Sequence, residues 1–264
     1  MTTTTGFAQT RDGSSIWYRI DRPNAPVDPT RPPVVLISGL GADETIWEPA
    51  LESLDGSTIV RLHNRGIGHS ADIPSPAWTT RDAAADVAAV LDAAALPRAA
   101  VYGHSLGGRI AQWVAADFPD RVTRLVLGAT TTGDVHGFPR PEAATRAFEA
   151  GNPVAALELI FSPSYLAAHP EAAATTESRA TSPEQGALQL AMSTAHDAWE
   201  ALPRIRARTL VVHGVDDGVT DVRNASVLRD HIADADLLLL AGARHAYFCE
   251  RPDANAIIAA FLAG

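Results

Sequence analysis

The stretch VYGHSLGG, residues 101–108, decides the fold of this chain. It follows a short run of β-forming residues and precedes a segment whose apolar residues recur with helical spacing. Within it, Gly103, Ser105 and Gly107 match Gly-x-Ser-x-Gly, a pattern in which a strand turns at once into a helix. Side chains two positions before and two after the apex of such a turn would collide. We therefore predict a strand–turn–helix unit that exposes the Ser105 hydroxyl beside the free N–H groups of the new helix.

Short apolar runs, typical of strands covered on both faces, lie on either side of this unit. They are residues 34–37, 59–62, 125–127, 209–212 and 237–240. Helical patterns at about 80–95, after Ser105 and at 253–262 alternate with them, and a hairpin turn at Asp12-Gly13 joins runs at 7–10 and 15–20. This alternation predicts an α/β fold, with a mostly parallel twisted sheet and helices on both faces.

Residues 131–202 interrupt the alternation. They are rich in alanine, contain no run of parallel-strand character, and are broken into short helices by prolines at 139, 141, 153, 163, 170 and 183. A helical block inserted between two sheet segments is expected to sit over the carboxyl ends of the strands. We therefore expect 131–202 to form a helical cap, and 1–130 with 203–264 to form the core.

The amino-acid composition limits the possible binding partners and the cellular compartment of the protein. The chain has 264 residues, 46% of them hydrophobic, and a formal net charge of −10, which opposes binding to nucleic acid or to an anionic membrane surface. The single cysteine, Cys249, excludes an internal disulfide framework and fits a reducing compartment. No signal peptide or membrane-spanning run is readable. We expect a cytoplasmic protein with a small-molecule substrate, and whether it forms homo-oligomers is left open.

A serine hydroxyl becomes a nucleophile only beside a base and an acid that orients the base. Of the nine histidines, His245 alone follows the last predicted strand on a loop at the same sheet edge as Ser105. The loop after the preceding strand carries two adjacent aspartates, of which only one can face His245. The order serine, acid, histidine therefore predicts Ser105, Asp217 and His245 as a triad, with Asp216 as the alternative acid.

Taken together, these motifs resemble those of the α/β-hydrolase-fold serine hydrolases. The matching segments are Gly-His-Ser-x-Gly-Gly at 103–108, Gly-x-x-Asp at 214–217, Gly-x-x-His at 242–245 with Glu-x-Pro at 250–252, and Arg-Gly-x-Gly-x-Ser at 65–70. Residues 38–41, with Trp47 downstream, look closest to the small bacterial esterases and the 3-oxoadipate enol-lactonase-like group. Two positions depart from the family pattern, Ser38 where histidine is usual and His63 where aspartate is usual.

The resemblance implies a mechanism. Ser105 would attack a carbonyl carbon, with His245 as the base and Asp217 holding the imidazole in the useful tautomer. The backbone N–H groups of Leu40 and Leu106 would form the oxyanion hole. No cofactor is expected, and the histidines lack the spacing of a metal site, so no metal is expected either.

The residues of the substrate pocket are harder to predict than the triad, because a large side chain can either line a pocket or pack in the core. The candidate pocket residues are Trp47, Trp113, Phe138, Phe161 and Trp199, and Phe148 and Tyr165 are the other large aromatic residues of the cap. Three arginines could pair with a substrate carboxylate or could be solvated surface charges: Arg140, Arg146 and Arg179.

The predicted function is hydrolysis of a carboxylic ester or lactone through an acyl-enzyme on Ser105. Two alternatives keep the triad: a cofactor-free perhydrolase of the haloperoxidase type, and a hydrolase of carbon–carbon bonds in diketones. A third is a ligand-binding or signalling protein that kept the fold with little turnover. Dehalogenase and epoxide hydrolase chemistry is disfavoured, because those family members use an aspartate nucleophile where this chain has Ser105.

Overall fold

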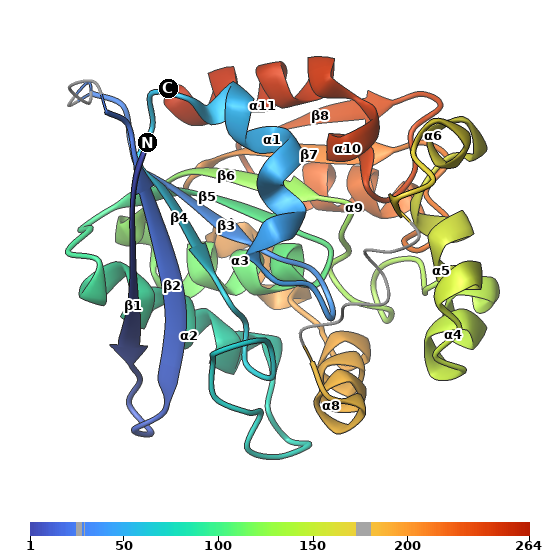
Figure 1. Cartoon of the computed structure of the whole chain (residues 1–264), viewed down its shortest axis with the longest axis horizontal. Coiled ribbons are helices and arrows are strands. Elements are labelled where there is room, and N and C mark those ends of the chain that lie inside the picture. The colour runs from blue at the N-terminus through green and yellow to red at the C-terminus, as the bar shows by residue number, and fades with distance from the viewer. Residues whose placement is uncertain (25–27, 29, 173–180) are drawn as a thin grey trace.

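The computed structural model describes residues 1–24, 28, 30–172 and 181–264. Within them, eight strands form one sheet in the order β1-β2-β4-β3-β5-β6-β7-β8 (Figure 1). The strands are β1 (Thr2–Gln9), β2 (Ser15–Arg22), β3 (Val34–Ile37), β4 (Ile59–Leu62), β5 (Ala99–His104), β6 (Val122–Gly128), β7 (Arg208–Gly214) and β8 (Ala235–Leu240). Strand β2 is antiparallel to β1 and β4, and every other neighbouring pair is parallel. The predicted α/β class with a mostly parallel sheet is confirmed.

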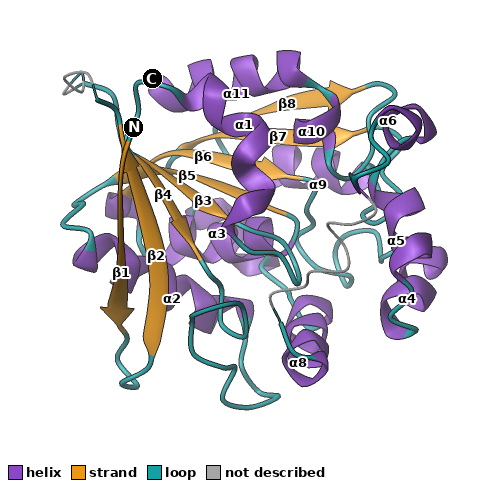
Figure 2. Cartoon of the chain, viewed as in Figure 1, coloured by secondary structure: helices purple, strands orange, loops and turns teal. Residues whose placement is uncertain are grey.

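Helices cover both faces of the sheet (Figure 2). One face carries α2 (Thr80–Ala93), α3 (Leu106–Asp117) and α9 (Arg223–His231), and the other carries α1 (Glu48–Leu51), α10 (Tyr247–Glu250) and α11 (Pro252–Ala263). Successive strand residues therefore point into two different cores. In β5, Val101 packs with α2 and α3, whereas Tyr102 packs with Trp47 and α10. This double burial explains why the central strands read as unbroken apolar runs.

Several element bounds differ from the sequence prediction. The hairpin is longer than predicted, because the β-branched residues 2–5 pair with residues 19–22 of β2. Helix α2 ends at Ala93 rather than near residue 95, and Ala95 adopts the left-handed conformation (φ 55°) that stops it. Helix α9 was not predicted, since only Ala225 and Leu228 among its apolar residues are buried and its periodic signal is short.

In its described part, the segment between β6 and β7 contains helices joined by loops and no strand beyond the isolated bridge of Gly133 with Asp197. It contains α4 (Glu142–Glu149), α5 (Pro153–Ile160), α6 (Pro163–Ala168), α8 (Pro183–Thr194) and the 3₁₀ helix η4 (Trp199–Arg204). Helices α5, α6 and α8 each begin on a proline that follows an Asn or Ser N-cap, because proline fits the first helical turn and cannot continue an earlier helix. Helices α4, α5, α6 and α8 lie beyond the ends at which the parallel strands finish (Figure 2). No described helix is long and apolar enough to cross a membrane.

Candidate active site

Ser105 stands at the apex of the turn between β5 and α3. Its backbone has φ 57° and ψ −117°, which a residue with a side chain adopts only under strain. Its own N–H donates to Gly128 O of the neighbouring strand, so the turn is anchored on the sheet. The predicted strand–turn–helix unit is present, and it presents the Ser105 side chain at the carboxyl edge of the sheet.

The glycines beside Ser105 are required by close backbone contacts. A Cβ atom on Gly107 would lie 1.9 Å from Ile37 O, and one on Gly103 would lie 2.2 Å from Gly107 O. Real Cβ atoms are not found at such distances from backbone oxygen, and a backbone atom cannot move aside as a flexible side chain can. The glycines therefore let α3 begin directly against β3 and β5.

The structure brings Asp217, and not Asp216, to His245. Asp217 Oδ2 lies 2.8 Å from His245 Nδ1, and the carboxylate is fully buried. The Asp216 side chain is exposed and makes no hydrogen bond to a described residue. Since a carboxylate can only accept, the contact fixes the proton of a neutral His245 imidazole on Nδ1 and leaves Nε2 free to accept another.

Asp217 is held by more than His245. Its second oxygen, Oδ1, accepts hydrogen bonds from the backbone N–H groups of Val219 (2.7 Å) and Thr220 (2.9 Å). His213 Nε2 lies 3.0 Å from Oδ2. Burial alone would raise the pKa of Asp217, but attraction to His245 and hydrogen bonds from both histidines hold it well below its usual range. Asp217 is therefore an ionised carboxylate.

His213 was not assigned this role from the sequence. The sequence does place His213 four residues before Asp217, at the end of β7. That position alone does not predict a contact with the acid, because many histidines end strands for reasons of packing. Its Nε2 also lies 3.1 Å from Thr220 O, so one N–H bridges the acid and the loop that follows it.

His104, directly before Ser105, points away from the serine hydroxyl, as the motif predicts. Its Nε2 lies 2.9 Å from His245 O, and its ring contacts that of His245 at a centroid distance of 4.8 Å. Burial, with a smaller contribution from His245, lowers the pKa of His104 to about 3. His104 is therefore neutral and donates from Nε2 to the backbone of the histidine loop.

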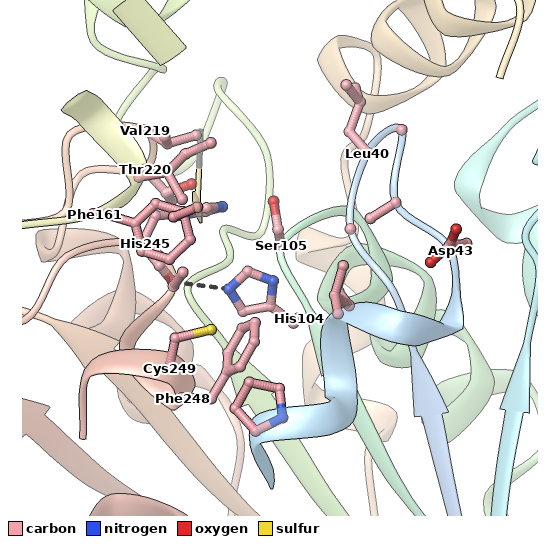
Figure 3. Close-up of a pocket in the computed structure, with 18 of the residues that line it drawn as sticks. Leu40, Asp43, His104, Ser105, Phe161, Val219, Thr220, His245, Phe248 and Cys249 are labelled. Atoms are coloured by element: carbon pink, nitrogen blue, oxygen red, sulfur yellow. Dashed lines mark hydrogen bonds between the residues drawn. The ribbon is translucent and has the colours of Figure 1, made fainter. Parts of the chain in front are cut away.

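Ser105 and His245 both project into one cavity of about 400 Å³ (Figure 3). A cavity of this size is typical of small-molecule sites. In the described part of the chain no hydrogen bond joins the Ser105 hydroxyl to the imidazole. Such contacts are often long or poorly aligned without substrate and tighten when it binds.

The two residues expected to form the oxyanion hole lie beside Ser105. Neither the Leu40 N–H nor the Leu106 N–H is used by a hydrogen bond among the described residues, so both are free to donate. Leu40 lies on a loop that faces Ser105 across the cavity (Figure 3).

Buried polar side chains hold that loop. Ser38 Oγ accepts from Trp47 Nε1 (3.0 Å) and donates to Asp43 O (2.9 Å), so the serine that replaces the usual histidine has a defined structural role. From α8, Gln189 Oε1 accepts from Gly41 N (2.9 Å), while its Nε2 donates to Arg65 O (2.7 Å). Gln189 is wholly buried and was not singled out from the sequence.

Of the five aromatic residues named for the pocket, Phe161 lines the cavity. Trp47 does not, because it is fully buried against Tyr102 and Phe248. Trp113 lies under Arg81 of α2, since its face of α3 turns toward that helix.

The remaining two named aromatics pack against residues of α9 and do not line the cavity. Phe138 lies under Arg223, with the guanidinium carbon 3.9 Å from the ring centre. Trp199 stacks between His136 and His231. Phe148 and Tyr165, two other large aromatic residues between β6 and β7, do line the cavity.

The three arginines considered for a substrate carboxylate fall in different places. Arg140 lines the cavity, Arg146 is exposed and pairs with Glu142, and Arg179 lies outside the described residues. Arg109, one helical turn after Ser105, also lines the cavity and was missed. In the described ranges, His, Cys, Asp and Glu side chains form no group of three that could hold a metal ion.

Comparisons with known proteins agree with this geometry. The family model for the alpha/beta hydrolase fold matches residues 32–252. A Variovorax paradoxus protein, named provisionally as a carbamate hydrolase, is 30% identical over 225 residues, 81% of this chain and 85% of its own.

Two solved structures are similar over nearly the whole chain. The enol-lactonase of Burkholderia xenovorans superposes with a TM-score of 0.84 at 26% identity, covering 98% of this chain and 100% of its own. A hydrolase of Pseudomonas aeruginosa superposes with a TM-score of 0.83 at 28% identity and 99% coverage of both chains. The chain therefore belongs to the α/β-hydrolase family, and it is a hydrolase.

Proposed function

We propose that this enzyme cleaves carboxylic esters or lactones of small molecules through an acyl-enzyme on Ser105. One observation carries the proposal: the Asp217–His245 pair and the strained Ser105 face a single cavity. Each group has the property that acyl transfer needs, namely a hydroxyl that lines the cavity, an imidazole oriented through Nδ1, and an ionised acid behind it.

In the proposed first half-reaction, Ser105 Oγ attacks the carbonyl carbon while His245 Nε2 takes its proton. The imidazolium that forms is stabilised by Asp217, whose position is already fixed by two backbone N–H groups and by His213. His245 then returns the proton to the leaving alkoxide as the carbon–oxygen bond breaks. The acyl group remains on Ser105; the alcohol of an ester leaves, whereas that of a lactone stays attached to the acyl group.

The negative charge on the carbonyl oxygen needs donors that are in place before it develops. The N–H groups of Leu40 and Leu106 serve this role in our proposal, since neither is used elsewhere by a described residue. Loss of one such donor typically lowers kcat by ~10²–10³. In the second half-reaction, His245 activates a water that attacks the acyl carbon, and Ser105 leaves with its proton restored.

The relatives widen the choice of acyl substrates. One similar structure is an enol-lactonase and one similar sequence is named provisionally as a carbamate hydrolase, so the proposed class includes lactones and carbamates beside simple esters. We extend the proposal to a cytoplasmic setting, which the single free cysteine, Cys249, supports.

Labelling with a fluorophosphonate tests the nucleophile. The wild-type chain is expected to be labelled on Ser105, and Ser105→Ala to be unlabelled. Ser164→Ala, which removes an exposed serine of the cap, is the matched control and is expected to label like the wild type. Labelling that persists unchanged in Ser105→Ala would overturn the assignment.

A substrate panel separates the proposed reaction from its alternatives. We expect short aryl esters, lactones and aryl carbamates to be turned over by the wild type and not by Ser105→Ala. Turnover of a β-diketone and of no ester would favour carbon–carbon hydrolysis. Halogenation of a dye by bromide, peroxide and a carboxylic acid, without ester turnover, would favour the perhydrolase. Ser105 labelling without turnover of any member would favour a binding protein.

A further inference from the structure

One short segment between β6 and β7 contacts both loops that carry the candidate acid and base. It comprises residues 159–162, which are the last two residues of α5 and the two that precede α6, and we call it the α5–α6 junction. The acid loop, residues 215–220, follows β7 and carries Asp217. The histidine loop, residues 241–246, follows β8 and carries His245. The α5–α6 junction is therefore placed to affect both members of the pair.

The end of helix α5 bonds directly to these two loops. The last carbonyl groups of a helix have no partner within it. Here Leu159 O accepts from Gly218 N (3.2 Å), and Ile160 O accepts from Ala246 N (3.0 Å). These two donors directly follow the acid and the base in the sequence. The carbonyl groups that α5 leaves unpaired thus become fixed acceptors for both loops.

Glu250, from the Glu-x-Pro motif, joins the other end of the junction to the histidine loop. Its Oε1 accepts from Ser162 N, and its Oε2 accepts from Arg244 N (2.7 Å). Among the described residues, no cationic side chain forms an ion pair with this half-buried carboxylate. Hydrogen bonds from N–H groups to an ionised carboxylate are stronger than those between neutral groups. The Glu250 side chain is therefore used to connect two main-chain segments.

The residues on either side of His245 are held by the junction or by Glu250. Besides the bonds made by Arg244 N and Ala246 N, Arg244 Nη1 donates to Phe161 O (3.3 Å). The carbonyl of His245 itself is bonded to His104. The backbone around the imidazole thus has a fixed partner at each step, and two of these partners belong to the α5–α6 junction.

The contact between the junction and the acid loop is close. A Cβ atom on Gly218 would lie 3.0 Å from both Cα and O of Leu159, which is tighter than most Cβ contacts. Glycine at this position lets the two backbones approach. The junction also presents the Phe161 side chain to the cavity that His245 lines (Figure 3). A segment that only shaped the cavity would need that side chain, but not main-chain bonds to both loops.

We propose that the α5–α6 junction positions Asp217 and His245 relative to each other, and that Glu250 is the positioning residue that holds it in place. This inference rests on the proposed function, because it concerns the triad of the same reaction. A misplacement of about 1 Å by a change remote from the chemistry can cost about 10²-fold in rate. The segment between β6 and β7 is then needed for the chemical step as well as for the wall of the cavity.

Esters of different size separate the two roles of the segment. In Glu250→Gln the amide oxygen can accept from one N–H group, but the NH₂ group faces the other. We expect kcat per active site to fall by about tenfold or more, equally for an aryl acetate and an aryl hexanoate, with little change in KM. Active sites are counted by fluorophosphonate labelling carried to completion, so unfolded protein does not enter the rate. The rate constant of that labelling should fall as well.

Two further variants complete the test. Glu158→Gln removes an exposed carboxylate near the same end of α5 and is the matched control, expected to keep the wild-type kcat. Glu250→Asp keeps the charge but is one methylene shorter, so its loss of kcat should be smaller than that of Glu250→Gln. Wild-type kcat in both Glu250 variants would overturn the positioning role. A loss confined to KM, or one found only with the hexanoate, would overturn it too.

A spectroscopic measurement separates this inference from the proposed function. The N–H that His245 donates to Asp217 is expected to give a low-field proton resonance in Ser105→Ala, identified by its absence after His245→Gln is added. Adding Glu250→Gln should shift or broaden this resonance, whereas adding Glu158→Gln should leave it in place. That result would support the positioning role even if no ester were cleaved and the proposed function failed. An unchanged resonance with Glu250→Gln would contradict it, while ester cleavage by Ser105 would leave the proposed function standing.

Discussion

One oxygen of the Asp217 carboxylate, Oδ2, lies 2.8 Å from Nδ1 of His245. The same oxygen lies 3.0 Å from Nε2 of His213, so two imidazoles converge on one buried acceptor. Asp216, one residue earlier, is exposed and makes no side-chain contact of this kind with a described residue. The two adjacent aspartates thus form a natural pair of test and control.

Replacement of the acid tests its role. Asp217→Asn is expected to lower kcat for an aryl ester by ~10⁴, because the amide can donate to Nδ1 and favour the wrong tautomer of His245. Asp216→Asn is expected to stay within about twofold of the wild type. The measurement is steady-state kinetics on purified variants with fluorophosphonate titration of active sites. A large loss in Asp216→Asn with activity kept in Asp217→Asn would reverse the assignment.

Gln189 of α8 holds the loop that carries Leu40, because it accepts a hydrogen bond from Gly41 N. We expect Gln189→Ala to lower kcat by about tenfold with little change in KM, because the Leu40 N–H is needed most in the transition state. Gln185→Ala is the control on the same helix, since Gln185 accepts from Ile73 N and does not contact this loop. Equal effects of the two variants on kcat would show that α8 acts only through stability.

Replacement of Gly107, two residues after Ser105, tests the packing of the turn. Gly107→Ala is expected to lower the free energy of unfolding by about 3 kcal/mol or more, because its Cβ would collide with Ile37 O. Gly13→Ala is the control: its φ is +80°, no atom lies within 4 Å of the added carbon, and only about 1–2 kcal/mol of backbone strain is expected. Urea denaturation measures both, and equal losses would contradict the role of the close contact.

The low pKa of His104 predicts a pH dependence of stability. The unfolded chain protonates this residue near its ordinary pKa of 6.5, whereas the folded chain resists protonation down to about 3. Stability contributed by neutral His104 is therefore lost as pH falls from about 6.5 toward 3, by up to about 1.4 kcal/mol per pH unit. His104→Gln keeps a donor for His245 O without the titration, so its stability should fall less steeply. Parallel curves for the two proteins, measured by urea denaturation, would contradict this account.

The order of the core elements was predictable from the sequence because both faces of the central strands are buried. Val34 and Leu36 pack on one face of the sheet and Val35 and Ile37 on the other, which produces an apolar run without alternation. The turn at Ser105 was equally readable, since its glycines are imposed by local backbone contacts.

The pocket was much less predictable, because it depends on which way each helix faces. Phe161 and Trp199 are both large aromatic residues between β6 and β7, yet Phe161 lines the cavity and Trp199 packs against two histidines. Contacts between segments far apart in the sequence could not be predicted either. One example is the hydrogen bond of Gln189 with Gly41, 148 residues away. Arg109 could have been found from its spacing of four residues after Ser105, but its position in the wall of the cavity is visible only in the fold.

The central claim is a covalent acyl group on Ser105, and mass spectrometry of the quenched enzyme tests it most directly. Wild-type protein is mixed with an aryl ester, quenched within a few turnovers and digested. We expect the peptide containing Ser105 to gain the mass of the acyl group, and Ser105→Ala to gain none and to turn over at the background rate. Wild-type turnover in Ser105→Ala, or an acyl group found on another residue instead, would contradict the account.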